Sequence, residues 1–305
     1  MNKLSYRSIS FPSSPPLTNG ILNISKSKLC WAAITVGRPG KAAVKSFGDY
    51  SVNEALYRWN MVRASIDMTA AGGHFVNSDL FNALDPTEKG GVNFYLGMIF
   101  AKIAAQDLLS IPWLVHFHWM SQNHAVPLTA GSSSPDLLGL SPVTNLWSVF
   151  EAKGRNATYS SALMTKAKTQ ANNLTTVDGQ NCERYVGTQL YRNSTKQLKF
   201  TWEDPEPDDE HPIFLKTNRH MWLRYYGVAH AIYERQRTVA LSSSEQLGFK
   251  IDFAPEALKL IDALKTPRRP FRKQLKKLCE WSSEYLKQPS EGWSGDGIQI
   301  SMDRD

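Results

Sequence analysis

Two acids and a lysine lie close together near the middle of the chain. Asp136 follows Pro135, and Glu151 and Lys153 come at the end of the apolar run WSVFEAK. Carboxylates are the hard oxygen ligands that Mg²⁺ prefers, and a bound Mg²⁺ can activate water for attack on phosphorus. A lysine beside the ion can orient that water, hold the phosphate and offset charge in the transition state. These residue types predict metal-dependent hydrolysis of a phosphodiester bond.

Two short strands are expected to position these side chains. Residues 136–140 and 146–153 have strand character, and the Ser-Pro-Val-Thr-Asn turn between them predicts a hairpin. Adjacent strands lie about 4.8 Å apart, so acids on neighbouring strands can share one cation. Strand alternation puts Glu151 and Lys153 on the same face. The alternative is an ordinary ion pair at a solvated strand end.

The flanking segments predict the order helix, three strands, helix, strand. The first helix begins after Asp85 as N-cap, with Pro86 and Glu88 in its first turn. WLVHFHW after Pro112 reads as the first strand, ahead of the hairpin. Helical spacing then covers residues 159–174, and strands are expected at 183–191 and 198–202.

Pro135-Asp136, fourteen intervening residues and Glu151-Ala152-Lys153 resemble the motif of the PD-(D/E)xK phosphodiesterase superfamily. The predicted order looks like its restriction-endonuclease-like α-β-β-β-α-β core, an α/β fold with a mixed central sheet. The resemblance covers about residues 86–202. It implies that Asp136, Glu151 and the main-chain carbonyl of Ala152 ligate Mg²⁺, for which Mn²⁺ can substitute. It also implies that Lys153 completes the site.

The same resemblance implies a basic or amide residue on the following helix. Lys166 and Gln170 are four residues apart and share a helix face, so they are candidates to support the site. A solvated helix face is the alternative. Many superfamily members carry a further acid on the helix before the first strand, but neither Glu88 nor Asp107 is a good match. The second metal is therefore in doubt.

Nucleic acid is the partner that the resemblance implies, and a net charge of +7 with a pI near 9.2 would draw a polyanion to the surface, although charge alone is only a hint. Arg155, just past the second hairpin strand, is expected to contact a backbone phosphate. A basic run near the C-terminus predicts a phosphate-binding stripe, with a solvated face or a contact to the acidic segment 203–210 as alternatives. Its members are Arg269, Arg272, Lys273, Lys276 and Lys277.

The rest of the chain is expected to flank this core. Residues 1–84 form an irregular arm over 1–27, a strand at 29–36 and a helix from about 52. Residues 85–203 form the nuclease core. Residues 204–305 form a helical extension packed on it, with helices at 213–239, 255–264 and 270–287.

Several other classes have little support. The N-terminus has no secretory pattern and the most apolar stretch is interrupted by polar residues, so we expect a cytoplasmic protein without a membrane span. Three widely spaced cysteines predict neither zinc nor a disulfide framework. No G-x-S-x-G elbow is present. His116 and His118 lack a third ligand and are expected to be structural.

The expected function is that of a Mg²⁺-dependent nuclease, with internal or terminal cutting left open, acting on double-stranded DNA more than RNA. By analogy with bacterial restriction and anti-phage systems, a defence effector is expected, as a homodimer or a subunit of a defence complex. The alternative is a catalytically silent nuclease-like fold that binds nucleic acid or a partner protein.

Overall fold

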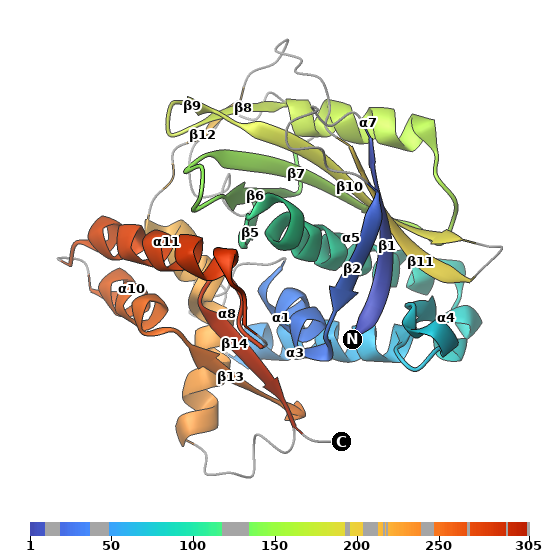
Figure 1. Ribbon diagram of the computed structural model, residues 1–305, viewed down its shortest axis with the longest axis horizontal. Helices are drawn as coiled ribbons and strands as arrows, with labels where there is room; N and C mark the ends of the chain where they lie inside the picture. The colour runs from blue at the N-terminus through green and yellow to red at the C-terminus, as the bar shows by residue number, and fades with distance from the viewer. Residues whose placement is uncertain are drawn as a thin grey trace.

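In the part of the chain that the structure describes, nine strands form one mixed sheet (Figure 1). The computed structural model describes residues 1–9, 19–36, 49–117, 134–192, 196–203, 213–215, 217, 219–238, 247–266, 269–290 and 292–303. The main path of the sheet runs β2-β1-β11-β10-β7-β6-β5, and β3 and β4 join at β11. The bounds are β1 (Asn2–Ile9), β2 (Gly20–Ile24), β3 (Ile66–Asp67), β4 (Val76–Asn77), β5 (Trp113–His116), β6 (Leu137–Leu140), β7 (Trp147–Gly154), β10 (Glu183–Arg192) and β11 (Gln197–Glu203).

Strand directions divide the sheet into two parts. β5, β6 and β7 form an antiparallel meander, in which Leu137 pairs with Phe150. β10 runs parallel to β7, with Val186 beside Glu151. β11 is antiparallel to β10, and β1 is parallel to β11. The hairpin expected from the sequence is therefore confirmed as β6 and β7.

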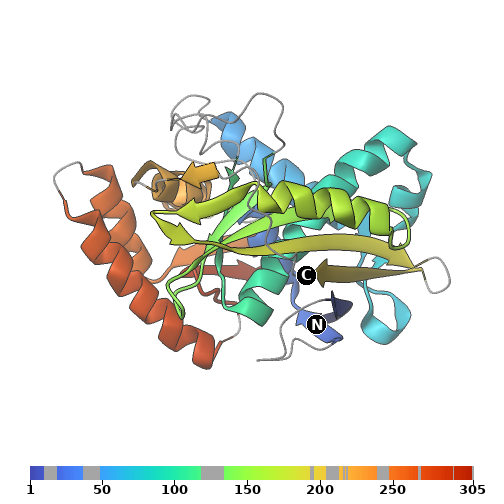
Figure 2. The same cartoon turned by 90° about the horizontal axis from the view of Figure 1, so that it is seen from above.

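Helices cover both faces of the sheet (Figures 1 and 2). The long helix α5 (Pro86–Leu109) packs on β7 and β10 from one side, and α1 (Lys26–Thr35) and α3 (Asp49–Ser65) lie on that same side. The helix α7 (Ser161–Asn172) covers the opposite face, where it buries Met164, Ala167 and Ala171 against Val186. The sheet is thus the middle of three layers.

The expected helix start at Asp85 is confirmed. The Asp85 side chain accepts hydrogen bonds from the N–H groups of Thr87 and Glu88, at 2.6 Å and 2.9 Å. The Glu88 carboxylate in turn accepts the Asp85 N–H at 3.0 Å, and Pro86 fills the first helical position. This capping box fixes where α5 begins, and the helix then places its apolar side on the sheet.

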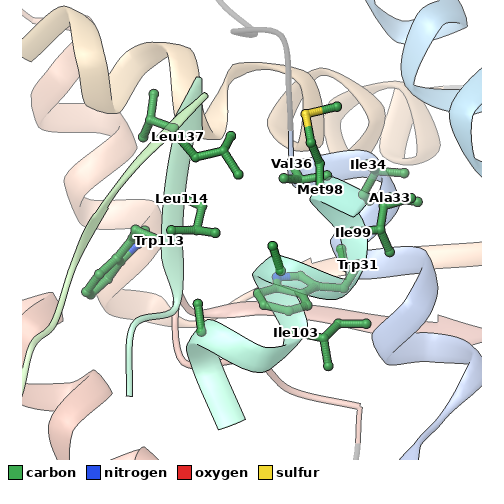
Figure 3. Packing of buried hydrophobic residues seen from close by; sticks show 14 of the residues in the cluster. Trp31, Ala33, Ile34, Val36, Met98, Ile99, Ile103, Trp113, Leu114 and Leu137 are labelled. Carbon is green, nitrogen blue, oxygen red and sulfur yellow. The ribbon is translucent and has the colours of Figure 1, made fainter. Parts of the chain in front are cut away.

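The largest apolar core lies between the sheet and the helices α1 and α5. Figure 3 shows Trp31 of α1, Ile99 and Ile103 of α5 and Leu114 and Leu137 of the strands pointing into one cluster. All of these side chains are buried. Because Leu137 directly follows Asp136, this packing fixes the face to which the Asp136 side chain can turn.

Two glycines allow α5 to approach β7 very closely. A Cβ atom on Gly154 would lie 1.6 Å from the carbonyl oxygen of Asn93, and one on Gly97 would lie 2.6 Å from the carbonyl carbon of Lys153. Only glycine fits at either position. The helix therefore rests directly on the main chain that carries Lys153.

The C-terminal third adds a helical layer, a two-stranded sheet of its own and one strand of a second small sheet, whose other two strands lie at residues 174–181. β8, β9 and β12 form one small sheet, and β13 and β14 form the other. The remaining elements are α4 (Asp79–Ala83), β8 (Leu174–Val177), β9 (Gln180–Asn181), β12 (Ile213–Leu215), α8 (Arg219–Thr238), β13 (Phe249–Phe253), α10 (Pro255–Lys265), α11 (Phe271–Lys287), β14 (Ile298–Met302) and a short 3₁₀ turn (Ala71–Gly73). Among the described helices, none has the length and apolar character needed to cross a membrane.

A buried polar cluster ties this third to the core. Lys102 of α5 donates to the Tyr225 hydroxyl of α8 at 2.6 Å, and that hydroxyl donates to Asp296, just ahead of β14. Trp31 also donates to Asp296, at 2.8 Å. Burial lowers the pKa of Lys102 to about 7 and raises the pKa of Asp296, while each charge opposes the other's shift. The cluster links α1, α5, α8 and the C-terminal strand.

Three expectations about the flanking segments are wrong. Residues 29–36, expected as a strand, lie mostly in α1, whose N-cap Ser25 accepts the Lys28 N–H at 3.1 Å. The segment is buried nearly all round, so it lacks the periodicity that separates helix from strand. The expected irregular arm 1–27 contains β1 and β2, paired into the sheet. The expected helix 213–239 is interrupted, with β12 preceding α8.

Candidate active site

Strand register brings Asp136 and Glu151 face to face. Leu137 pairs with Phe150, so Asp136, one residue before β6, falls opposite Glu151. Phe117 donates its N–H to the Asp136 carbonyl at 2.8 Å, which extends the ladder to this residue. Directly opposed residues in antiparallel strands have Cβ atoms about 4.5–5.5 Å apart. The two acids therefore meet on the face that α7 covers.

Reciprocal hydrogen bonds hold the two carboxylates against each other's strand. The Asp136 N–H donates to Glu151 Oε2 at 3.0 Å. The Ala152 N–H donates to Asp136 Oδ2, also at 3.0 Å. Each acid keeps a second oxygen, so the side chains are oriented without using all their acceptor capacity.

Lys153 joins this pair from the same face of β7. Its Nζ donates to Glu151 Oε1 as an ion pair. The Glu151 side chain is fully buried, whereas 24% of the Lys153 side chain is exposed. The lysine thus connects a buried carboxylate to the surface.

Burial sets the protonation of the two acids. Desolvation raises the pKa of Glu151 to about 8, the negative charge of Asp136 adds to this, and Lys153 opposes it. Desolvation also raises the pKa of Asp136, against the Lys153 charge and the Ala152 hydrogen bond. The pair of acids therefore favours a bound proton even with Lys153 beside it.

The Ala152 carbonyl faces the same edge as the Asp136 side chain. In a strand, the N–H and C=O of one residue point to the same neighbour. The Ala152 N–H donates to the side chain of Asp136, which comes one residue before β6 begins at Leu137. The Ala152 carbonyl therefore points to the same side of β7, towards Asp136. Within the described residues, no cluster of three or more His, Cys, Asp or Glu side chains is placed to hold a metal. A site of two carboxylates and a main-chain carbonyl needs only two such side chains.

Lys166 and Gln170, the α7 residues expected to support the site, form no bond to the two carboxylates among the described contacts. Lys166 is exposed, on the side of α7 away from the buried Met164 and Ala167, and Gln170 is half-buried. Lys168, rather than either of these two residues, reaches the sheet and forms an ion pair with Glu203. Thr188 donates to the Met164 sulfur at 3.0 Å and so seats α7 on β10.

The acids considered for a second metal have other partners. Glu88 caps α5, and Asp107 forms an ion pair with Lys28 at 2.8 Å. His118 lies outside the described residues, and His116 lies in β5. Asn93 was missed by sequence reasoning, although it is buried in α5 with its carbonyl against Gly154. The sequence indicated Asn93 only as a polar residue within an otherwise apolar side of a helix.

The basic residues expected to bind phosphate lie in two places. Arg155 follows β7 directly and is half-buried, with no acid beside it among the described residues. Arg269 forms an ion pair with Asp262, so part of its charge is already used. Four further cations on α11 are exposed and lack an acid partner in the described part of the chain: Arg272, Lys273, Lys276 and Lys277. The predicted stripe therefore keeps most of its charge.

Comparison with known proteins adds no relative: no family model, no curated protein and no solved structure matches this chain.

Proposed function

We propose that this protein is a Mg²⁺-dependent nuclease with a restriction-endonuclease-like core. The observation that carries the proposal is the opposed pair Asp136 and Glu151, with Lys153 bonded to it. The order α5-β5-β6-β7-α7-β10 supports it, because it is the α-β-β-β-α-β order that the resemblance implies. β8 and β9 are an insertion between α7 and β10.

The donor set fits a hard divalent cation. Asp136 and Glu151 offer carboxylate oxygens, and Ala152 offers a carbonyl oxygen at the same edge, which are the ligand types that Mg²⁺ prefers. A Mg²⁺ ion held there would supply an activated water and neutralise charge on the phosphate. Mn²⁺ would substitute, since it accepts the same oxygen ligands.

The protein groups would do the rest of the work. The Lys153 ammonium, part exposed and anchored by Glu151, is placed to hold a phosphate oxygen and to orient the attacking water. Burial of Glu151 lowers the local dielectric, which strengthens these charge interactions. Arg155, two residues further on, would hold a neighbouring phosphate.

The proposal extends to the substrate and its setting. We propose double-stranded DNA as the substrate, a cytoplasmic location and a role in bacterial restriction or anti-phage defence. Cutting both strands would require two active sites, so a homodimer or a larger defence complex is part of this proposal. The cations of α11, which have no acid partner in the part of the chain that the structure describes, support a polyanionic partner.

A catalytically silent nuclease-like fold is the second candidate. One observation favours it: the two acids already accept hydrogen bonds from each other's strands, and Lys153 pairs with Glu151 without a metal ion. Such a protein would bind DNA or a partner protein with no dependence on Mg²⁺.

Cleavage assays separate the two candidates. The full chain is incubated with linear DNA, circular DNA and RNA in Mg²⁺ or Mn²⁺, alongside Glu151→Gln purified identically. Cleavage by the wild-type chain alone supports the nuclease, and the preferred substrate identifies DNA or RNA. DNA binding that is the same in both chains, with no cleavage of any substrate at high enzyme concentration, would establish the silent fold.

A further inference from the structure

A hollow of about 350 Å³ lies between α11 and the end of the sheet where β7 begins. Its walls come from β6, β7, β9, α8 and α11. Figure 1 shows α11 lying below this end of the sheet, on the side of the turn between β6 and β7. This volume is in the range of pockets that hold small organic groups. We call it the α11 pocket.

The floor of the α11 pocket is apolar and largely aromatic. Leu140 and Trp147 are a cross-strand pair, and Trp147 contacts Trp222 of α8, with ring centroids 6.2 Å apart. Phe271 and Leu275 of α11 are half-buried at the opposite wall. A flat ring entering here would meet apolar surface on two sides, which is the usual setting for a nucleobase.

The rim of the pocket is basic. Arg272 and Lys276 lie four residues apart on α11, so they project on the same side of the helix. Neither has an acid partner among the described residues. An exposed pair of this kind beside an apolar floor fits a ligand that has both a ring and a phosphate.

Polar groups complete the lining. Asn145, Asp178 and Gln180 face the pocket from the turns at this end of the sheet. Both oxygens of Asp178 are held by Thr217, whose N–H donates at 2.8 Å and whose hydroxyl donates to the other oxygen. An amide and an oriented carboxylate are groups that hydrogen-bond the edge of a base.

The pocket and the catalytic pair share one face of the sheet. Trp147 and Glu151 are four residues apart on β7 and, by strand alternation, point to the same side. At about 3.3 Å per residue, they are about 13 Å apart along the strand. At 3.4 Å per base pair, this distance is about four steps of duplex DNA.

We propose that the α11 pocket binds an unpaired nucleotide of the DNA strand, its base on the aromatic floor and its phosphate on Arg272 and Lys276. A base that stays paired and stacked in a duplex cannot lie flat on the aromatic floor of this hollow, so the ligand is a nucleotide in a single-stranded overhang. This inference rests on the proposed function, since it assigns the pocket to the substrate of the same site. It predicts a preference for DNA with single-stranded ends.

Binding to labelled DNA tests the proposal without requiring turnover. All chains carry Glu151→Gln, and affinity is compared for a blunt duplex and for the same duplex with a four-nucleotide overhang, at one salt concentration. We expect the overhang to tighten binding about ten-fold, and an abasic overhang to lose most of that gain. Equal affinity for blunt and overhang DNA would overturn the proposal.

Two matched variants on α11 separate the pocket from the charge of the helix. Arg272→Ala with Lys276→Ala should abolish the overhang preference. Lys273→Ala with Lys277→Ala removes the same charge from residues that do not line the pocket, and should weaken both DNAs alike. Equal effects of the two pairs on the overhang preference would contradict the pocket.

A third variant closes the pocket without altering charge. Gln180 is exposed in β9, so Gln180→Trp should fold normally while filling part of the hollow. We expect it to remove the overhang preference and leave blunt-duplex affinity unchanged. An unchanged overhang preference in this variant would refute the assignment. The assignment would also fail if free dAMP bound tightly in the pocket while none of the three variants changed the affinity for overhang DNA. Wild-type cleavage is scored separately, so failure of the nuclease proposal would be seen independently.

Discussion

Asp136 and Glu151 each accept a main-chain N–H from the strand that carries the other. The donors are the Ala152 N–H for Asp136 and the Asp136 N–H for Glu151, both at 3.0 Å. The two side chains are therefore oriented by the hairpin itself. A neutral amide in place of either acid keeps an oxygen for this hydrogen bond and loses the charge, and at Glu151 it also loses the oxygen that accepts from Lys153.

Glu151→Gln and Asp136→Asn should therefore each abolish cleavage while the chain stays folded. Loss of a metal-binding carboxylate is expected to reduce kcat by about 10³-fold or more, because both charge neutralisation and water activation depend on it. Rates are measured on DNA in Mg²⁺, with Glu284→Gln as an exposed control that should retain full activity. Cleavage at the wild-type rate by either amide variant would exclude the site.

Lys153→Met should reduce cleavage strongly while the chain stays folded. The lysine side chain is part exposed, so its removal leaves no large cavity, but the phosphate loses its nearest cation. We expect a fall in kcat of about 10²-fold or more with DNA affinity reduced far less. Arg155→Met is the comparison: as a phosphate contact it should raise KM and leave kcat nearly unchanged.

Mg²⁺ affinity should rise with pH. The raised pKa of Glu151, about 8, means that its carboxyl holds a proton at neutral pH, which Mg²⁺ must displace. Below the pKa of about 8, affinity should increase up to about ten-fold per pH unit for one displaced proton. Thermal shift titrations between pH 6.5 and 8.5 measure this, and Glu151→Gln should show a much weaker pH dependence. A flat profile in the wild-type chain would contradict the pKa assignment.

The metal-free protein should lose stability over the same range. When a carboxyl has a higher pKa in the folded than in the unfolded state, the folded state keeps a proton that the unfolded state has lost. For Glu151 this window lies between the ordinary value of 4.5 and about 8, so its contribution to the free energy of unfolding falls as pH rises. Glu151→Gln should therefore gain stability relative to wild type from pH 5 to pH 8 in EDTA, as measured by urea unfolding.

Gly154→Ala should be severely destabilising. Its Cβ would lie 1.6 Å from the Asn93 carbonyl oxygen, a main-chain atom that cannot move without shifting α5. We expect a loss of more than about 3 kcal/mol or failure to fold. Gly90→Ala in the same helix meets nothing within 4 Å and should be neutral or stabilising by up to about 1 kcal/mol. Similar stabilities for the two variants would contradict the close packing of α5 on β7.

Lys102→Met should cost about 3–5 kcal/mol, because it leaves the buried Asp296 without its cation. Adding Asp296→Asn should restore part of that loss. The double variant should lose less free energy of unfolding than the sum of the losses of the two single variants. A coupling of at least about 1 kcal/mol in a double-mutant cycle is expected. Strict additivity would show that the two groups act independently.

Local signals were enough to predict the segments around the site. The Asp85 capping box, the short turn between β6 and β7 and the helical spacing of α7 all agree with the structure, because each depends on residues near one another in the chain. The hairpin also predicted that Asp136 and Glu151 would meet. Their reciprocal hydrogen bonds and raised pKa values depend on register and burial, which the sequence does not state.

Long-range pairing was beyond the sequence. β1 lies at the N-terminus and pairs in parallel with β11, nearly 200 residues away, so no local turn announces it. In the sequence, Lys102 indicated only a polar interruption of an apolar helix. Its role could not be predicted, because its partners Tyr225 and Asp296 come from distant segments. For α7, periodicity gave the helix but not its rotation, and Lys168 rather than Lys166 faces the sheet.

Asp136 and Glu151 face each other only when Leu137 pairs with Phe150, so the carboxylate pair depends on the alignment of β6 and β7. A slip of one residue between β6 and β7 would turn the Asp136 side chain towards α5, and a slip of two would set it opposite Val149 or Lys153. A cation held by both acids would then bind only the native alignment. At a free Mg²⁺ concentration one hundred times the dissociation constant, binding would stabilise the native alignment by about 2.7 kcal/mol. Mg²⁺ would then select the correct strand register during folding.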